Sequence, residues 1–220
     1  MATQKSNSVL GDFTGSVGTV TLTKWMDLAV MKSRIGARHK KTTSVPLIRQ
    51  NNVFGMVSHF FSSARELIRM GYQRPKVAKM TPFNAMASYH LKNAIIGDPD
   101  NPVISLSKIK LTFPIRKTQS VWNPVLSLEA GNNVIVNWET NPFPHKCTQL
   151  DDKVILVYYN KNGGSFNFIR EDIDRSHLSH SCRFGAGYNN HEIYWYMFLI
   201  SADGKLVSET EYLGMVTLSS

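Results

Sequence analysis

The sequence predicts an α+β protein in two parts: a basic N-terminal part of glycine-rich strands and two helices, and an immunoglobulin- or fibronectin-III-like β-sandwich. Three observations predict this class. Apolar residues recur at helical spacing between residues 44 and 97, short strand-forming runs follow one another between residues 104 and 212, and the net charge changes sign between the parts. We therefore expect one domain over residues 1–118 and a second over residues 119–220.

The charge of the chain is distributed unevenly between these two parts. Residues 1–118 contain 18 Lys and Arg against 5 Asp and Glu, a net charge of +13. Residues 119–220 contain 7 against 11, a net charge of −4. This asymmetry favours either a polyanionic partner or packing between oppositely charged parts of identical subunits. The alternative interpretation is that these charges serve only to solvate the surface.

Glycines punctuate the beginning of the chain. Gly11, Gly15 and Gly18 do not have the spacing of a nucleotide-binding loop, and residues 19–25, which follow, are rich in strand-forming residues. We therefore interpret the glycines as positions for a tight hairpin, a bulge or a close backbone approach. Residues 27–34 read as a second extended segment.

Two helices are predicted next. Ser44 is a candidate N-cap, and an apolar face continues to about Met70, with Gly71 as the stop. The signal recurs at Thr81 and Pro82 and predicts a second helix that ends at Gly97. Each helix needs a cover for its apolar face, for which we considered the glycine-punctuated strands and a neighbouring subunit.

The sandwich is predicted around residues 133–138, which alternate between polar and apolar. Val134, Val136 and Trp138 are expected on the buried face, or Ile135 and its neighbours if the register shifts by one. The strands expected to partner it lie at residues 154–159 and 193–200. Further segments expected to complete the β-rich part lie at 104–113, 125–128, 165–169, 181–184 and 207–212.

Possible sites for chemistry are fragmentary. His177, His180 and Cys182, with His145 and Cys147 if the loops meet, have residue types that bind zinc, but they also suit ordinary loops and strands. Acidic clusters suggest calcium but lack the spacing of an EF-hand, and solvated turns explain them better. The clusters contain Asp151, Asp152, Glu171, Asp172 and Asp174. We expect no enzymatic activity, no metal and no cofactor.

The chain has two cysteines, Cys147 and Cys182, too few for a disulfide framework. A reducing compartment is the simpler expectation, although a single bridge depends on the distance between the two residues. Residues 1–8 are polar and resemble no secretory signal, and no apolar window is long enough to span a membrane. We expect synthesis in the cytoplasm, with an assembled particle or extracellular filament as a further destination.

Four motifs stand out along the chain. They are GxFxGxVGTV at residues 11–20 followed by Trp25, PFNA at 82–85 with LKNAI at 91–95 and Gly97, VxVxW at 134–138, and SxTxYxG at 208–214. Together they resemble a domain-of-unknown-function family common in Bacteroidetes, over nearly the whole chain. The resemblance implies no activity, cofactor or catalytic residue. The basic run at residues 38–41 departs from the proline-rich turn expected there.

Two functional hypotheses follow. The first is a structural protein that assembles with copies of itself into a filament, shell or virion-type particle. The alternative is a nucleic-acid-binding protein that uses the basic N-terminal domain. The scattered charges and the lack of a helix-turn-helix, RRM or OB signature favour the first. No small-molecule substrate is inferred. The expected contacts to a polyanion or a second subunit are Arg38, Lys40, Lys41, Arg74, Lys76 and Lys79.

Overall fold

The fold is taken from a computed structural model of the chain, which forms two compact units, Met1–Val45 and Pro46–Ser220. The structure describes residues 2–4, 14–25, 28–34, 44–73, 80–98, 100–114, 116 and 118–219. The sequence analysis placed a boundary between residues 118 and 119, whereas these compact units separate at residue 45 and keep the helices with the sandwich.

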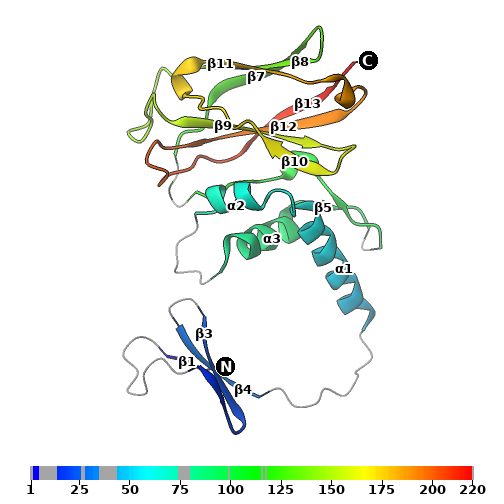
Figure 1. Ribbon diagram of the computed structural model, residues 1–220, viewed down its shortest axis with the longest axis vertical. Helices are drawn as coiled ribbons and strands as arrows, with labels where there is room; N and C mark the ends of the chain where they lie inside the picture. The colour runs from blue at the N-terminus through cyan, green and yellow to red at the C-terminus, as the bar shows by residue number, and fades with distance from the viewer. Residues whose placement is uncertain are drawn as a thin grey trace. The chain divides into compact units, whose positions relative to one another are not determined.

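The first unit is a four-stranded antiparallel sheet in the order β1-β4-β3-β2 (Figure 1). A tight turn joins β2 to β3, and Gly18 adopts a left-handed φ of +57° there, which confirms that a glycine serves a hairpin. The second expected extended segment is also present, as β4. The strands are β1 (Ala2–Gln4), β2 (Gly15–Val17), β3 (Val20–Trp25) and β4 (Leu28–Ser33).

The helix expected from Ser44 to Met70 is broken, so its prediction as one element is wrong. It forms α1 (Val45–Phe60) and α2 (Arg65–Gly71). Between them, the Ala64 N–H donates to the Phe61 carbonyl in a tight turn. The Ser63 hydroxyl accepts the Phe166 N–H of the sandwich at 2.9 Å. The break thus brings this turn into contact with a strand, which helical periodicity alone does not reveal.

The second helix, α3 (Pro82–Asn93), begins as expected. The Thr81 side chain accepts the Asn84 N–H at 3.2 Å and caps the helix. The helix ends before Gly97, which instead has a φ of +91° after the short strand β5 (Ile95–Ile96). The end expected from the glycine is therefore wrong, because a left-handed residue suits this turn as well as a helix C-terminus.

The strand expected over residues 104–113 is largely absent. Only β6 (Val103–Ile104), paired with β5, and a single 3-10 turn (Leu106–Lys108) form there. The backbone beyond them bonds to side chains instead of to a neighbouring strand. The Lys110 N–H donates to the His90 ring at 3.1 Å, and the Leu111 N–H donates to the Thr210 hydroxyl at 3.0 Å.

Seven strands form the expected sandwich of two antiparallel sheets, with orders β11-β8-β7 and β10-β9-β12-β13. The strand expected at 207–212 begins later, and Val207 makes only an isolated bridge to Ile200. The strands are β7 (Trp122–Glu129), β8 (Asn133–Glu139), β9 (Lys153–Asn160), β10 (Ser165–Phe168), β11 (Ser179–Arg183), β12 (Glu192–Ile200) and β13 (Glu211–Thr217).

The interior of the sandwich confirms the first of the two registers considered for β8. Val134, Val136 and Trp138 are all buried. They face β9 and β12 of the other sheet, where Leu156 and Trp195 are fully buried. The strands first considered as partners of β8 thus lie opposite it, and β8 pairs with β7 and β11.

The helices cover the outer face of the four-stranded sheet, which makes Pro46–Ser220 a three-layer unit (Figure 1). Tyr196 and Phe198 of β12 share a core with Phe61, Leu67 and other helical residues. The covers considered for the helices were the N-terminal strands or another subunit, whereas the helices use the sandwich. Among the described residues, no helix has both the length and the apolar character needed to cross a bilayer.

Candidate functional site

One side of the N-terminal sheet carries mainly aliphatic residues, and the other side combines polar residues with Trp25 and Val30. The pairing register places Val17, Val20, Leu22 and Met31 on the same side, which we call the apolar face. None of the described side chains of this sheet is buried, and Val17 and Met31 are 75% and 44% exposed. The other side carries Ser16, Thr21, Thr23, Trp25, Val30 and Lys32. Because a sheet normally packs its apolar face against another layer, this surface is a candidate contact site.

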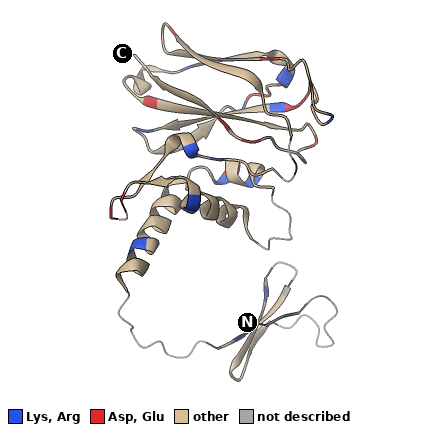
Figure 2. Ribbon diagram, turned by 180° about the vertical axis from the view of Figure 1, so that it is seen from behind, with Lys and Arg blue, Asp and Glu red and all other residues tan. Residues whose placement is uncertain are grey.

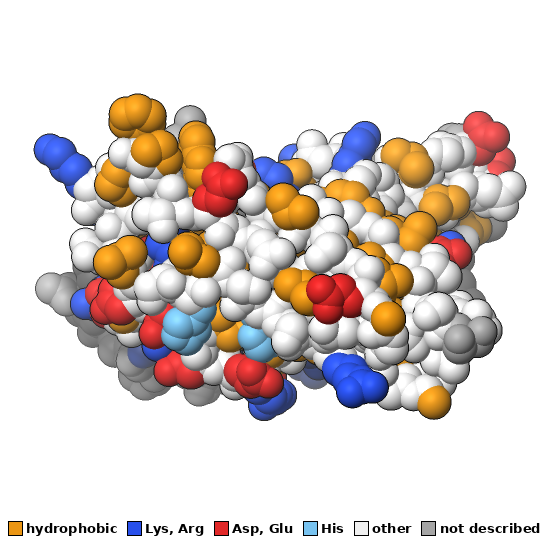
Figure 3. Space-filling view, turned by 90° about the horizontal axis from the view of Figure 1, so that it is seen from above, with side chains coloured by type: hydrophobic (Ala, Val, Ile, Leu, Met, Phe, Trp, Pro, Cys, Tyr) orange, Lys and Arg blue, Asp and Glu red, His pale blue; other side chains and the backbone are white. Residues whose placement is uncertain are grey.

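Two edge strands of the sandwich, β7 and β13, lie close together and carry exposed apolar residues. Val125 is 57% exposed, and its neighbours along this border are also exposed. Figure 3 looks onto the sandwich from above, where apolar side chains stand among uncharged ones and acidic side chains gather at the lower left near two histidines. We call these two strands the sandwich border, and their exposed apolar residues are Trp122, Val125, Leu128, Tyr212 and Met215. The register places Val125 on the outer face of the three-stranded sheet and Met215 on the helix-facing side of the four-stranded sheet. Unpaired strand edges of this kind are places where another chain can add.

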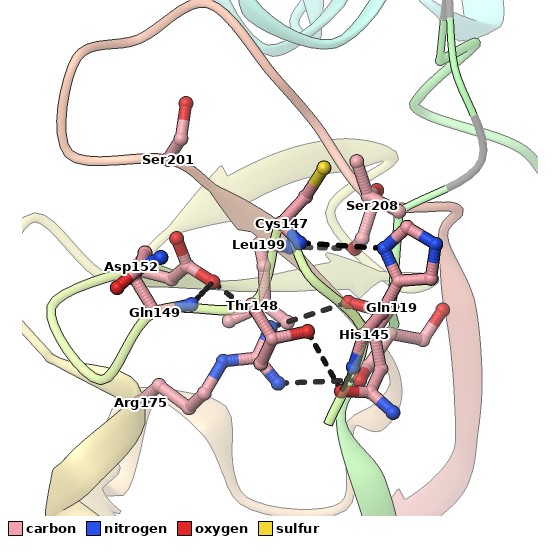
Figure 4. A network of polar contacts seen from close by, with 12 residues as sticks. Gln119, His145, Cys147, Thr148, Gln149, Asp152, Arg175, Leu199, Ser201 and Ser208 are labelled. Atoms are coloured by element: carbon pink, nitrogen blue, oxygen red, sulfur yellow. Dashed lines mark hydrogen bonds and ion pairs between the residues drawn. The ribbon is translucent and has the colours of Figure 1, made fainter. Parts of the chain in front are cut away.

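A buried ion pair joins the loops at one end of the sandwich (Figure 4). The Arg175 guanidinium donates to the Asp152 carboxylate at 3.1 Å, and their side chains are only 10% and 6% exposed. Arg175 also donates to the carbonyls of Gln119 and Ser120 at 3.2 and 3.4 Å. The pair therefore fixes the segment that enters the sandwich, which is a structural role.

A cavity of about 270 Å³ opens beside this ion pair. Its lining is mainly apolar, with Pro144 and Leu150 beside Asn141. Arg175, its ionisable lining residue, is already neutralised by Asp152. The lining residues named for this cavity supply neither a nucleophile nor a general base, so the site has no evident chemistry.

The residues considered for zinc are engaged separately. The His145 Nδ1 atom accepts the Cys147 N–H at 3.3 Å (Figure 4), and the His177 Nδ1 atom accepts the Asp174 N–H at 3.3 Å. His180 and Cys182 do share a face of β11, but His180 lies 3.8 Å from Glu171. The part of the chain that the structure describes holds no group of three or more His, Cys, Asp and Glu side chains placed to bind a metal.

The two cysteines do not pair, since both thiols are free. Burial raises the pKa of the Cys182 thiol, and the nearby Glu171 carboxylate raises it further. A raised pKa keeps the thiol protonated and makes it a poor nucleophile.

His90 of α3 is a buried titratable residue. Its Nδ1 atom donates to the Met86 carbonyl at 2.9 Å, and its Nε2 atom accepts the Lys110 N–H at 3.1 Å. Burial lowers the pKa of His90 to about 4, so the ring is neutral near pH 7. The ring joins α3 to the segment after the 3-10 turn, and its role is structural.

The basic contacts expected from the sequence are not located. Arg38, Lys40, Lys41, Arg74, Lys76 and Lys79 all lie outside the described residues. Two arginines that the prediction did not select, Arg65 and Arg69, lie side by side on α2 and line a cavity of about 380 Å³ with Thr81, Phe83 and Asn84 of the α3 N-terminus. The sequence signal for this pair was two arginines spaced four residues apart, on the side of the helix away from its buried residues.

The charge asymmetry of the sequence is visible in the structure. In Figure 2, Lys and Arg mark the helices, whereas most Asp and Glu lie on the strands and loops of the sandwich. Some charged residues of the helices nevertheless have partners of opposite sign. Arg49 lies 2.7 Å from Asp100, and Glu66 lies 3.2 Å from Arg170.

The comparisons with known proteins give a family but no activity. A model described as a family of unknown function, DUF6266, matches residues 12–214. None of the curated proteins matches the chain. The match covers nearly the whole sequence and confirms the resemblance to a domain-of-unknown-function family, so the chain belongs to the DUF6266 family.

Proposed function

We propose that this protein is a non-enzymatic structural protein that assembles with copies of itself through its N-terminal sheet. The observation that carries the proposal is the apolar face: a four-stranded sheet in its own compact unit, with no described side chain buried. A unit of about 45 residues is at the lower limit of what folds without added support. Pairing with a second layer supplies that support.

The composition of the apolar face favours a second copy as that layer. Among the described residues of the apolar face, the charged one is Lys24, which lies near the end of β3. Lys32 lies on the opposite side of the sheet. Two identical faces therefore meet without strong charge repulsion at their centres. Two sheets pack face to face about 10 Å apart, and the contact has the two-fold symmetry that is commonest in homo-oligomers.

Growth beyond a pair needs a second contact. The sandwich border offers one, because its exposed apolar residues, such as Val125 and Met215, lie on strands at the edges of their sheets. A chain with two different self-contacts builds filaments or shells. In this proposal, the protein is made in the cytoplasm and acts in the assembled particle or filament.

The test compares two double variants of the full-length chain. Val17→Lys with Met31→Lys places two charges on the apolar face, while Ser16→Lys with Thr21→Lys places two charges on the opposite side of the same sheet. We expect light scattering after size-exclusion chromatography to show an assembly for the wild type and the control. The first variant should dissociate because burying unpaired charges in an apolar contact is costly.

Two results contradict the proposal. The first is a wild-type chain that stays monomeric at every protein and salt concentration. The second is an equal loss of mass in both variants, which assigns the effect to added charge and removes the apolar face from the contact.

A further inference from the structure

We propose that the cavity between α2 and α3 binds the phosphate group of an anionic ligand, with Arg65 and Arg69 as the anion-binding side chains. The two arginines are one helical turn apart on α2 and face the N-terminal residues of α3 across the cavity. This site is separate from the apolar face, and the inference does not depend on self-assembly.

The arrangement of charges selects an anion. Glu66, which lies between the two arginines in the sequence, interacts with Arg170 at 3.2 Å. Within the part of the chain that the structure describes, Arg65 and Arg69 have no carboxylate within ion-pair distance, and no acidic residue is among the cavity's named lining residues. Guanidinium groups that lack a carboxylate are suited to bidentate binding of phosphate oxygens.

The opposite wall adds polar donors. The Thr81 hydroxyl accepts the Asn84 N–H at 3.2 Å, and Pro82 has no N–H. The Phe83 N–H, in the first turn of α3, has no acceptor within the helix and adds a donor at this wall. Asn84 also lines the cavity. Polar residues from two helices therefore border one space.

The Phe83 ring helps to position one of the two arginines. The Arg65 guanidinium lies 5.9 Å from the centre of the Phe83 ring, a cation–π distance that holds the arginine at the cavity. The volume of about 380 Å³ is larger than phosphate alone requires and falls in the range of small-ligand sites. A nucleotide and the sugar–phosphate backbone of a single strand share this chemistry.

The test measures binding of inorganic phosphate and AMP by calorimetry, and of a labelled ten-nucleotide oligo-dT by anisotropy, to the full-length protein. The variant is Arg65→Gln with Arg69→Gln. The matched control is Lys146→Gln with Arg183→Gln, which removes two exposed cations from the sandwich. Loss of a hydrogen bond to a charged group weakens binding about tenfold, so we expect a loss of at least about tenfold in the variant and little change in the control.

Unchanged thermal unfolding and an unchanged assembly mass of the Arg65/Arg69 variant separate the loss of this site from misfolding and from failure of self-assembly. Binding of AMP at least as tight as that of the oligonucleotide identifies a small phosphate ligand. Much tighter binding of the oligonucleotide, lost in the same variant, identifies a nucleic-acid backbone. Absence of binding for all three probes, or equal binding by the variant and the wild type, overturns the proposal.

Discussion

The protein contains two four-stranded antiparallel sheets that differ in their surroundings. The sheet β10-β9-β12-β13 is covered on one face by the other sheet of the sandwich and on the other by the three helices. The sheet β1-β4-β3-β2 has no buried side chain among its described residues. The same kind of sheet is thus buried on both faces in one unit, whereas the described side chains of the other unit's sheet are all at least partly exposed.

The sequences of the strands account for this difference. β9 and β12 contain nearly continuous apolar residues, so both of their faces are buried. The strands of the N-terminal sheet are shorter. β2 and β3 alternate with Ser, Thr and Lys, which suits one buried face, whereas β4 begins with four apolar residues. The comparison indicates that one layer is required for the N-terminal sheet, and we propose that a second copy provides it.

The largest expected effect is at the doubly covered sheet. Phe198→Ala removes a buried ring between β12 and the helices, and we expect the free energy of unfolding to fall by about 3–5 kcal/mol. Leu22→Ala, in dilute protein, should cost less than about 1 kcal/mol because the side chain is only partly buried. Urea unfolding followed by circular dichroism measures the free energy of unfolding of both variants. Equal losses in the two variants would contradict the difference in burial between the two sheets.

The next effect concerns the buried ion pair. Asp152→Ala leaves the Arg175 charge buried without a carboxylate, and we expect a loss of about 3 kcal/mol. Replacing both residues, as Asp152→Ala with Arg175→Met, should restore much of this stability since no buried charge remains. A double variant that is less stable than the single one, measured by the same unfolding experiment, would contradict a structural role for the pair.

A pH dependence is expected from His90. Burial lowers its pKa from 6.5 to about 4, so the unfolded chain binds a proton below about pH 6.5 while the folded chain does not. Stability is therefore full above pH 6.5 and falls as the pH decreases toward 4, by about 3 kcal/mol in total. His90→Phe should remove most of this slope in unfolding measured between pH 7 and pH 4.5. A slope equal to that of the wild type would assign the effect to other groups.

The smallest expected effect is at Gly55 of α1. An added Cβ atom there meets no atom within 4 Å, so Gly55→Ala should stabilise the protein by about 0.5–1 kcal/mol through helix propensity. Gly71→Ala is the contrast, because its Cβ would overlap the Leu111 carbonyl oxygen and should lower stability. We expect the melting temperature to rise in Gly55→Ala and to fall in Gly71→Ala, relative to the wild type. A stabilising Gly71→Ala would contradict the close approach of α2 to the segment around Leu111.

The strands of the sandwich were predictable because turn residues separate short apolar runs, and the alternation around Trp138 gave the buried face correctly. The break between α1 and α2 was not predictable, because buried residues continue through it at helical spacing. The hydrogen bond that holds the turn there comes from the backbone of Phe166, far along the chain. The sequence analysis also did not predict that the helices pack against the sandwich. The lack of alternation in β12 was the available signal, since it shows that a sheet is buried on both faces.

The candidate sites were less predictable than the fold. Arg65 and Arg69 follow from helical spacing only when the position of α3 is known, because the cavity is made by two helices. The apolar face follows from alternation in β3, but no pattern in the sequence identifies the layer that packs against it. Both features depend on contacts between distant segments, which local patterns do not specify.

The most direct measurement of the central claim is hydrogen exchange of the β3 backbone amides, Val20–Trp25, over a series of protein concentrations. If a second copy covers the apolar face, protection in β3 rises with concentration by mass action, while protection in β12 stays constant. Protection in β3 that is the same at every concentration, in a protein whose mass remains that of one chain, would contradict the account.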